Sequence, residues 1–152
     1  YKWWPAPWFT IFTTIILIAC YAYQVITRIQ DDTDYLQPQC SHLVFSPYRR
    51  KEVWRYFTYM FLHVNLQHLL MNIFLQLFVG LFLEMTHGTK KLAIVYIFGV
   101  ISGSLATSVF DQTVYLAGAS GGCYALIAAH VATLIINCND DVIILHQRFR
   151  LV

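Results

Sequence analysis

One serine hydroxyl stands between glycines in the run Gly118-Ala119-Ser120-Gly121-Gly122. Because glycine has no Cβ, another helix or an extended peptide can approach this hydroxyl closely, and the nearby backbone amides are free to point at an oxygen. A nucleophile with such donors beside it is what hydrolysis of a peptide bond requires. The alternative is a small serine bonded to its own helix backbone, which is the commoner case in membrane helices.

A second group of polar side chains precedes this run. His68, Asn72 and Gln76 follow one another at intervals of four residues, so they form one stripe on a helix with 3.6 residues per turn. Lipid offers the stripe no hydrogen-bond partner, and it must therefore face protein or water. His68, Asn72 and the backbone amide of Ser120 are donors of the types that hold the oxyanion of a tetrahedral intermediate. Hydrogen bonds between helices are the alternative explanation for each side chain.

The elements that must position these groups are membrane helices. Of the 152 residues, 58% are hydrophobic and 12% are charged, about half the charged fraction of soluble proteins. Four uncharged runs are long enough to span a bilayer, and a charged, aromatic loop that lies in the interface joins the first two. We expect spans at residues 8–26, 66–83, 92–110 and 113–137, and the interfacial loop at 27–65. The predicted fold class is all-α, a polytopic membrane helical bundle in one domain over residues 1–152.

The third of these spans carries a packing motif. Gly99 and Gly103 form a G-x-x-x-G pattern, and Ser104 follows directly. Small residues at this spacing let two helix backbones approach closely in a membrane. We therefore expect this face to pack against a neighbouring helix and to have no part in the chemistry.

Several other functions are excluded. The serine run also matches the G-x-S-x-G string of α/β hydrolases, but that motif needs a buried strand before the turn and a soluble sheet around it. The four cysteines, at positions 20, 40, 123 and 138, have no zinc-binding spacing, and there is no H-E-x-x-H. A net charge of +2 without a basic cluster among aromatics does not suggest nucleic acid. We expect no metal, no cofactor and no nucleic-acid partner. Basic residues are nearly balanced between the two membrane faces and leave the orientation open.

Three motifs in this order resemble a known family. Trp54-Arg55 followed by His63, then His68-Leu69-Leu70-Met71-Asn72, then Gly118 to Gly122 with Tyr124, are similar to the rhomboid intramembrane serine proteases, especially the animal secretory-pathway members. The resemblance covers nearly the whole chain. It implies a core of six helices, with a seventh in many animal members. It also implies an endopeptidase that cleaves single-pass transmembrane proteins within the bilayer of the Golgi, endosomes or plasma membrane.

The same resemblance implies roles for individual residues. Ser120 corresponds to the nucleophile, and His68 and Asn72, with the Ser120 amide, to the oxyanion hole. Tyr124 corresponds to a tyrosine that stacks on the catalytic histidine. The remaining matches are supporting residues: Gly118 and Gly121 beside the nucleophile, and Arg55, His63 and Glu84, which brace the interfacial loop and its helix contacts. Glu84 could equally be a solvated charge at a helix end.

One part of the family pattern is missing. The general base of rhomboid proteases is a histidine on a later helix, in a G-x-x-x-H-type packing motif, and these 152 residues stop before it. His130 lies ten residues beyond Ser120, about 15 Å along one helix. His146 falls in the polar tail, and His68 is already needed as a donor. We expect a C-terminally truncated domain that does not hydrolyse peptides alone, and a full-length protein that does so with a Ser-His dyad.

Two further classes stay open. A catalytically inactive rhomboid-like protein would keep this scaffold and bind transmembrane clients without cutting them. A channel or transporter would use the stripe of His68, Asn72 and Gln76 to line a water path. The predicted spans contain no Asp, Glu, Lys or Arg, so the transport alternative lacks the intramembrane charges that ion pathways use.

Overall fold

The computed structural model describes residues 6–31 and 42–149, with side chains for all of these except 28–31 and 139–149. Its regular elements are helices, apart from one isolated β-bridge. In chain order they are α1 (Trp8–Asp31), α2 (Arg55–Thr58), the 3-10 helix η2 (Tyr59–Phe61), α3 (Leu66–His87), α4 (Thr89–Phe110) and α5 (Ser120–Phe149).

Four helices of the described chain are long and apolar enough to cross a membrane: α1, α3, α4 and the first part of α5. This confirms the predicted all-α, multi-pass bundle. Two ends differ from the prediction. Helix α3 continues to His87, so Glu84 lies inside the second span. Helix α5 begins at Ser120 and not at residue 113, because the residues before it form a loop that pairs with the interfacial segment through Leu116.

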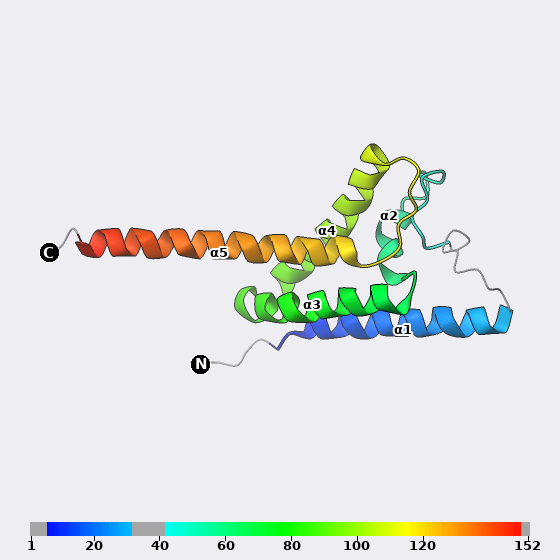
Figure 1. Ribbon diagram of the computed structural model, residues 1–152, viewed down its shortest axis with the longest axis horizontal. Coiled ribbons are helices and arrows are strands. Elements are labelled where there is room, and N and C mark those ends of the chain that lie inside the picture. The colour runs from blue at the N-terminus through cyan, green and yellow to red at the C-terminus, as the bar shows by residue number, and fades with distance from the viewer. Residues whose placement is uncertain (1–5, 32–41, 150–152) are drawn as a thin grey trace.

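The helices are arranged so that the N-terminal ends of α3 and α5 lie at the same end of the molecule. Helix α1 lies antiparallel beside α3, α4 is steeply tilted across them, and α2 with its loop covers one end (Figure 1). Gly88, with a φ of +87°, forms the tight turn from α3 into α4. Such a φ is accessible to glycine without strain, and the turn places α4 back against α3.

Two buried polar side chains of α3 hold α1 in place. The Glu84 carboxylate accepts hydrogen bonds from the backbone amides of Phe9 and Thr10, at 2.8 and 2.9 Å. It therefore caps the N-terminus of α1, where free amides and the helix dipole favour a negative charge. Two turns earlier along α3, the Gln76 amide donates to the hydroxyls of Thr13 and Thr14, at 2.8 and 2.9 Å.

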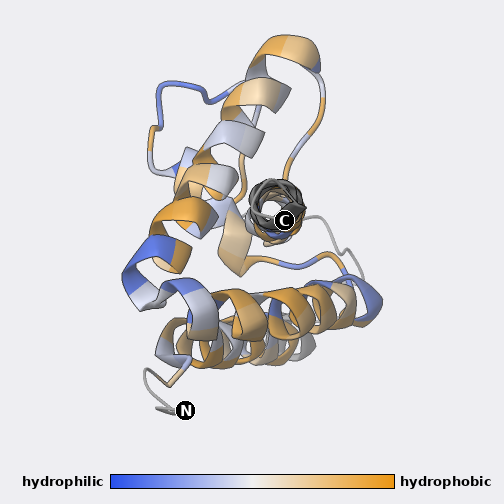
Figure 2. Cartoon of the chain, turned by 90° about the vertical axis from the view of Figure 1, so that its left-hand side faces the viewer, coloured by the Kyte–Doolittle hydropathy of each residue, from blue (hydrophilic) through white to orange (hydrophobic). Residues whose placement is uncertain are grey.

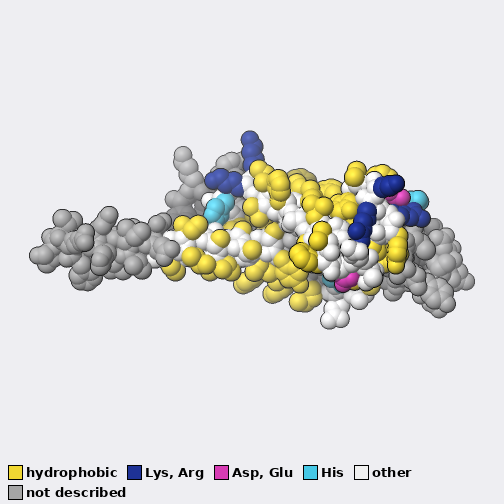
Figure 3. All heavy atoms as spheres, turned by 90° about the horizontal axis from the view of Figure 1, so that it is seen from above, with side chains coloured by type: hydrophobic (Ala, Val, Ile, Leu, Met, Phe, Trp, Pro, Cys, Tyr) yellow, Lys and Arg dark blue, Asp and Glu magenta, His cyan; other side chains and the backbone are white. Residues whose placement is uncertain are grey.

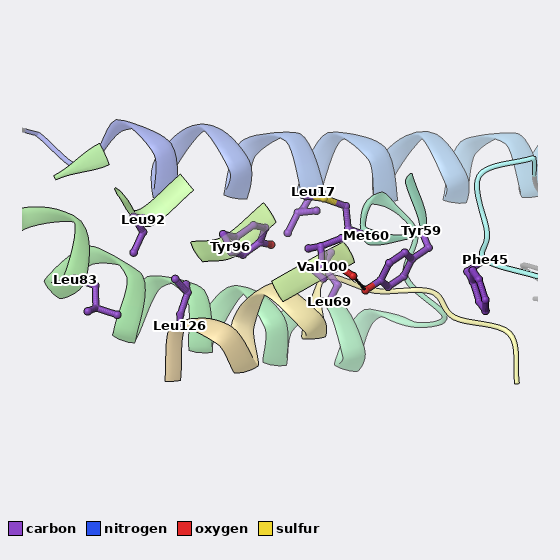
Figure 4. Close-up of a cluster of buried hydrophobic side chains, with 11 residues drawn as sticks. Leu17, Phe45, Tyr59, Met60, Leu69, Leu83, Leu92, Tyr96, Val100 and Leu126 are labelled. Atoms are coloured by element: carbon purple, nitrogen blue, oxygen red, sulfur yellow. Dashed lines mark hydrogen bonds between the residues drawn. The ribbon is translucent and has the colours of Figure 1, made fainter. Parts of the chain in front are cut away.

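The core is apolar and is formed by all four long helices together with η2. Leu17, Met60, Tyr96, Val100 and Leu126 meet there, each less than 5% exposed; Figure 4 shows their side chains converging between the ribbons. Hydrophobic residues make up most of the helices, whereas hydrophilic ones gather in loops and turns (Figure 2), and many large hydrophobic side chains of the helices are exposed. That distribution is expected where lipid is the solvent for the helices.

Helix α3 separates its polar and apolar residues onto opposite faces. Asn72 and Gln76 are 3% and 1% exposed, whereas Phe74 and Phe78, two residues further along, are 60% and 62% exposed. Two residues correspond to about 200° around a helix, so one face meets protein and the other meets lipid. The predicted stripe therefore faces protein.

Helices α4 and α5 cross through glycines. A Cβ built on Gly99 would lie 2.3 Å from the Cβ of Ala125 and 2.8 Å from the carbonyl oxygen of Gly121. A Cβ on Gly122 would lie 2.6 Å from the ring of Tyr96. Only glycine fits at these contacts, which confirms the packing role predicted for the first glycine of the G-x-x-x-G motif.

Candidate active site

Ser120 is the first residue of α5 and is half-buried. The amide of Cys123 donates to the carbonyl of Ala119 at 3.1 Å, which closes the first turn of the helix. The amides of Ser120, Gly121 and Gly122 precede that bond, at the positions where a helix leaves its N–H groups without intrahelical partners. Free amides and the positive end of the helix dipole favour a negative oxygen at this point.

His68 from α3 lies against the turn that leads into Ser120. A Cβ built on Gly118 would stand 2.5 Å from Cε1 and 2.8 Å from Nε2 of the His68 ring. Gly118 also has a φ of +124°, a conformation that side-chain-bearing residues rarely adopt. Both facts require glycine at this position. The imidazole of His68 therefore lies against a residue that precedes Ser120 by only two positions.

Asn72 lies one turn further along α3 and touches the first turn of α5. Its backbone carbonyl accepts the Cys123 thiol at 3.4 Å, and its side-chain amide donates to the carbonyl of His68 at 2.8 Å. Asn72 is 3% exposed. Helices α3 and α5 are therefore direct neighbours at the depth of Ser120, as the sequence predicts.

His63 lies beside His68 and is completely buried. The two rings meet edge to face with centroids 5.3 Å apart, and neither ring nitrogen of His63 has a hydrogen-bond partner within the described chain. Burial, and to a smaller extent the charge of His68, lower the pKa of His63 to about 4. His63 is thus neutral at pH 7 and packs as an aromatic wall against His68.

The interfacial loop is fastened by Arg55, as the resemblance implies. Its guanidinium, 2% exposed, donates to the Val44 carbonyl at 2.8 Å and pairs with the Glu52 carboxylate at 2.6 Å. The next residue, Phe45, exchanges backbone hydrogen bonds with Leu116, at 3.1 and 3.2 Å. Arg55 therefore holds the strand-like segment that supports the turn before Ser120.

Tyr59 is a supporting residue that sequence reasoning missed. Its carbonyl accepts the Gly118 amide at 3.0 Å, and its hydroxyl donates to the Val100 carbonyl at 2.7 Å (dashed line in Figure 4). A Cβ on Gly121 would lie 2.8 Å from the same hydroxyl. Burial raises the pKa of Tyr59 to about 12, which keeps the phenol a neutral donor. Tyr59 thus joins the turn before Ser120 to α4.

The other predicted residues make no hydrogen bond or ring contact with this cluster within the described chain. Glu84 lies at the opposite end of α3; it is fully buried, so the solvated alternative is wrong and the helix-contact role is the one observed. Tyr124 is 67% exposed and contacts no residue of the cluster through a hydrogen bond or ring pair in the described chain. His130 is half-buried on α5. The side chain of His146 lies outside the described residues.

Gln76 is part of the stripe but not of the site. The residue is 1% exposed, and its side chain is bonded to Thr13, Thr14, the Thr10 carbonyl and the Tyr96 hydroxyl, which donates to the side-chain carbonyl of Gln76 at 2.9 Å. A side chain that joins three helices does not line a water path, and this disfavours the transport alternative. Among the described residues, no three His, Cys, Asp or Glu side chains gather as a metal site.

A multi-pass bundle with a glycine-flanked serine at a helix N-terminus, next to a His/Asn pair on the neighbouring helix, defines a class of membrane proteins with a polar site between their spanning helices. Comparison with known proteins gives the family. The Rhomboid domain model matches residues 50–147, and the chain belongs to the rhomboid family.

Three relatives show the breadth of the family. The chain is 43% identical to human Rhomboid-related protein 3 over 135 residues, which are 88% of this chain and 33% of the relative. It is 37% identical to Inactive rhomboid-related protein 2 of Caenorhabditis elegans over 143 residues, 92% of this chain and 40% of the relative. It is 39% identical to Rhomboid-like protease 2 of Toxoplasma gondii over 84 residues, 55% of this chain and 30% of the relative. The chain therefore spans about a third of the length of these relatives.

Proposed function

We propose that the full-length protein is an intramembrane serine endopeptidase that cleaves single-pass transmembrane proteins, and that Ser120 is its nucleophile. The observation that carries the proposal is the contact of the His68 ring with Gly118, which sets an imidazole beside the turn that bears Ser120. The family supports it, because one relative is named a protease. We further propose a compartment of the secretory pathway, the Golgi, endosomes or plasma membrane.

The reaction in this proposal is acyl transfer. A histidine outside residues 1–152 takes the proton of the Ser120 hydroxyl, and the oxygen attacks a carbonyl of the unwound substrate segment. The negative charge that develops is held by the free amides at the start of α5, by Asn72 and by His68. One N–H of the Asn72 side-chain amide donates to the His68 carbonyl, and the second N–H of the same group is the donor for the oxyanion. The protonated histidine then gives its proton to the leaving amine as the C–N bond breaks, and water hydrolyses the acyl-enzyme to release the second product and regenerate Ser120.

A second candidate function is binding of transmembrane clients without cleavage. A relative of similar identity is named an inactive rhomboid-related protein. Against this stands the intact site: Gly118 leaves room for the His68 ring, and Gly121 leaves room for the Tyr59 hydroxyl. A non-catalytic scaffold has no need for these close approaches around a serine, so we favour catalysis.

The test is cleavage of a single-pass transmembrane substrate by the full-length protein in proteoliposomes. Wild-type protein should release a product cut within or next to the membrane segment, and Ser120→Ala should abolish the product while leaving the thermal unfolding temperature unchanged. The matched control is Ser102→Ala, an exposed serine on α4 whose hydroxyl bonds only to its own helix. Equal cleavage by wild type and Ser120→Ala would refute the assignment.

A further inference from the structure

A hollow between α3, α4 and α5 lies far from Ser120 and has no part in the proposed reaction. It has a volume of about 170 Å³ and is lined by Leu83, His87, Lys91, Leu92, Val95, Ala129 and Thr133. His87 is the last residue of α3, whereas His68 is near its first, so the helix length separates the hollow from the candidate active site. The hollow therefore belongs to the opposite half of the bilayer.

The walls of the hollow are hydrocarbon. Leu83 and Leu92 are 4% and 3% exposed and belong to the core, and Val95 and Ala129 pack against it. The Thr133 hydroxyl donates to the Ala129 carbonyl at 2.9 Å, so its polar atom is satisfied within its own helix. These five residues offer no unpaired polar group, so this part of the lining suits an alkyl chain and not water. Since one water takes about 30 Å³, the space is enough for several methylene groups.

The rim of the hollow is basic. Lys91 and His87 line it, and Lys90 is the adjacent exposed cation. Glu84, the acidic residue nearest in sequence, is fully buried and accepts hydrogen bonds from α1 and from the Thr89 hydroxyl. The ion pairs of the described chain lie in the interfacial loop, so neither lysine has a countercharge among the side chains that the structure describes. Figure 3 shows Lys and Arg gathered in groups toward the two ends of an apolar middle.

We propose that this hollow binds an acyl chain of an anionic phospholipid whose headgroup is held by Lys91 and His87. An apolar slot below the Lys91 ammonium matches both parts of such a lipid, since lysine reaches from the hydrocarbon boundary to the headgroup. A zwitterionic lipid fills the slot equally well but leaves this lysine without a net countercharge. The inference stands apart from the proposed proteolysis, because it concerns the opposite membrane face and needs no Ser120 chemistry.

The experiment uses full-length protein equilibrated with equal amounts of phosphatidylserine and phosphatidylcholine, followed by mass spectrometry of the intact complex. Wild-type protein should retain phosphatidylserine over phosphatidylcholine by about fivefold, the factor expected for one basic side chain near an anionic surface. Lys91→Gln should bring the ratio close to one. Ala129→Leu, which fills the hollow, should reduce retention of both lipids. Ser120→Ala should bind as the wild type does.

The controls separate a built site from general charge. Lys51→Gln makes the same charge change in the interfacial loop, where Lys51 is exposed, and should leave the ratio unchanged. Thr133→Leu fills the hollow from a second position, in case Ala129→Leu does not fold. Three results would overturn the proposal: no preference for phosphatidylserine in the wild type, an equal effect of Lys51→Gln and Lys91→Gln, or full retention in both filled variants. The last result would mean that a different part of the protein covers the hollow.

Discussion

The imidazole of His68 occupies the space that a side chain on Gly118 would need: a Cβ there would lie 2.5 Å from Cε1 of the ring. Gly118→Ala should therefore displace His68 and also strain a backbone with φ of +124°. We expect a loss of stability of about 1–3 kcal/mol and a fall in kcat on the order of 10- to 1,000-fold if His68 is an oxyanion donor. Thermal unfolding and substrate cleavage by the full-length protein measure the two effects.

Gly88→Ala is the matched control for this prediction. Gly88 also has a positive φ, +87°, but a Cβ there would meet nothing within 4 Å. Its replacement by alanine adds backbone strain of about 1 kcal/mol without moving a site residue. The stability should therefore fall slightly, and kcat should remain at the wild-type value. Equal losses of kcat in the two variants would show that the ring contact is irrelevant to activity.

The two glycines of the G-x-x-x-G motif should differ in their tolerance of alanine. A Cβ on Gly99 would lie 2.3 Å from the Cβ of Ala125, whereas the nearest atom to one on Gly103 is 3.4 Å away, on the Tyr59 hydroxyl. Gly99→Ala must separate α4 from α5 and should cost about 1–3 kcal/mol, while Gly103→Ala should be nearly neutral. Unfolding in detergent tests the difference, and the reverse order would contradict the packing described.

Glu84→Gln should loosen α1. The carboxylate accepts from the amides of Phe9 and Thr10 with two different oxygens, and an amide side chain would turn an NH₂ group toward one of these donors. We expect a loss of about 1–3 kcal/mol. Asp111→Asn, at an exposed carboxylate that bonds only within its own turn, is the control and should have little effect. Equal unfolding temperatures for wild type and Glu84→Gln would exclude the capping role.

Much of this arrangement follows from local pattern. Uncharged runs predicted the four spans, and the spacing of four residues placed Asn72 and Gln76 on one buried face of α3. Both features repeat within a single helix, so sequence alone carries them. The start of the fourth span was wrong because residues 113–117 continue the uncharged run, yet Leu116 pairs with Phe45 before the helix begins.

The features that sequence did not predict depend on distant partners. Tyr59 supports the turn before Ser120 through Gly118 and reaches Val100, 41 residues away. Within an aromatic stretch nothing distinguishes it from its neighbours, since its partners are backbone carbonyls and amides that every residue possesses. For Glu84 the resemblance implied a helix contact, but the local pattern left a solvated charge equally open, because its partners lie 74 and 75 residues earlier. From local sequence, a charged side chain at a helix end is expected to be exposed to solvent. Only the tertiary structure shows that the Glu84 carboxylate caps the N-terminus of α1.

Stability should depend on pH through His63. Burial, followed by the charge of His68, lowers the pKa of His63 to about 4 from the ordinary 6.5. Between these values the unfolded chain binds a proton that the folded chain does not. The contribution of this residue is therefore present above pH 6.5 and is lost as the pH falls toward 4, by an amount on the order of 3 kcal/mol.

His63→Phe isolates this effect, because phenylalanine preserves an aromatic edge against His68 but does not titrate. The unfolding temperature of the variant should fall less than that of the wild type between pH 7 and pH 4.5. Parallel curves for the two proteins would show that His63 is not the group responsible.

The central claim is that Ser120 is an activated nucleophile, and covalent labelling tests it most directly. A fluorophosphonate loses fluoride when a serine oxygen attacks its phosphorus, and mass spectrometry then locates the phosphonylated residue. We predict that the full-length protein carries the adduct on Ser120 and that Ser120→Ala carries none. We also predict that His68→Ala and Asn72→Ala react more slowly, on the order of 10- to 1,000-fold. A folded full-length protein that stays unlabelled, or labelling that persists in Ser120→Ala, would contradict the account.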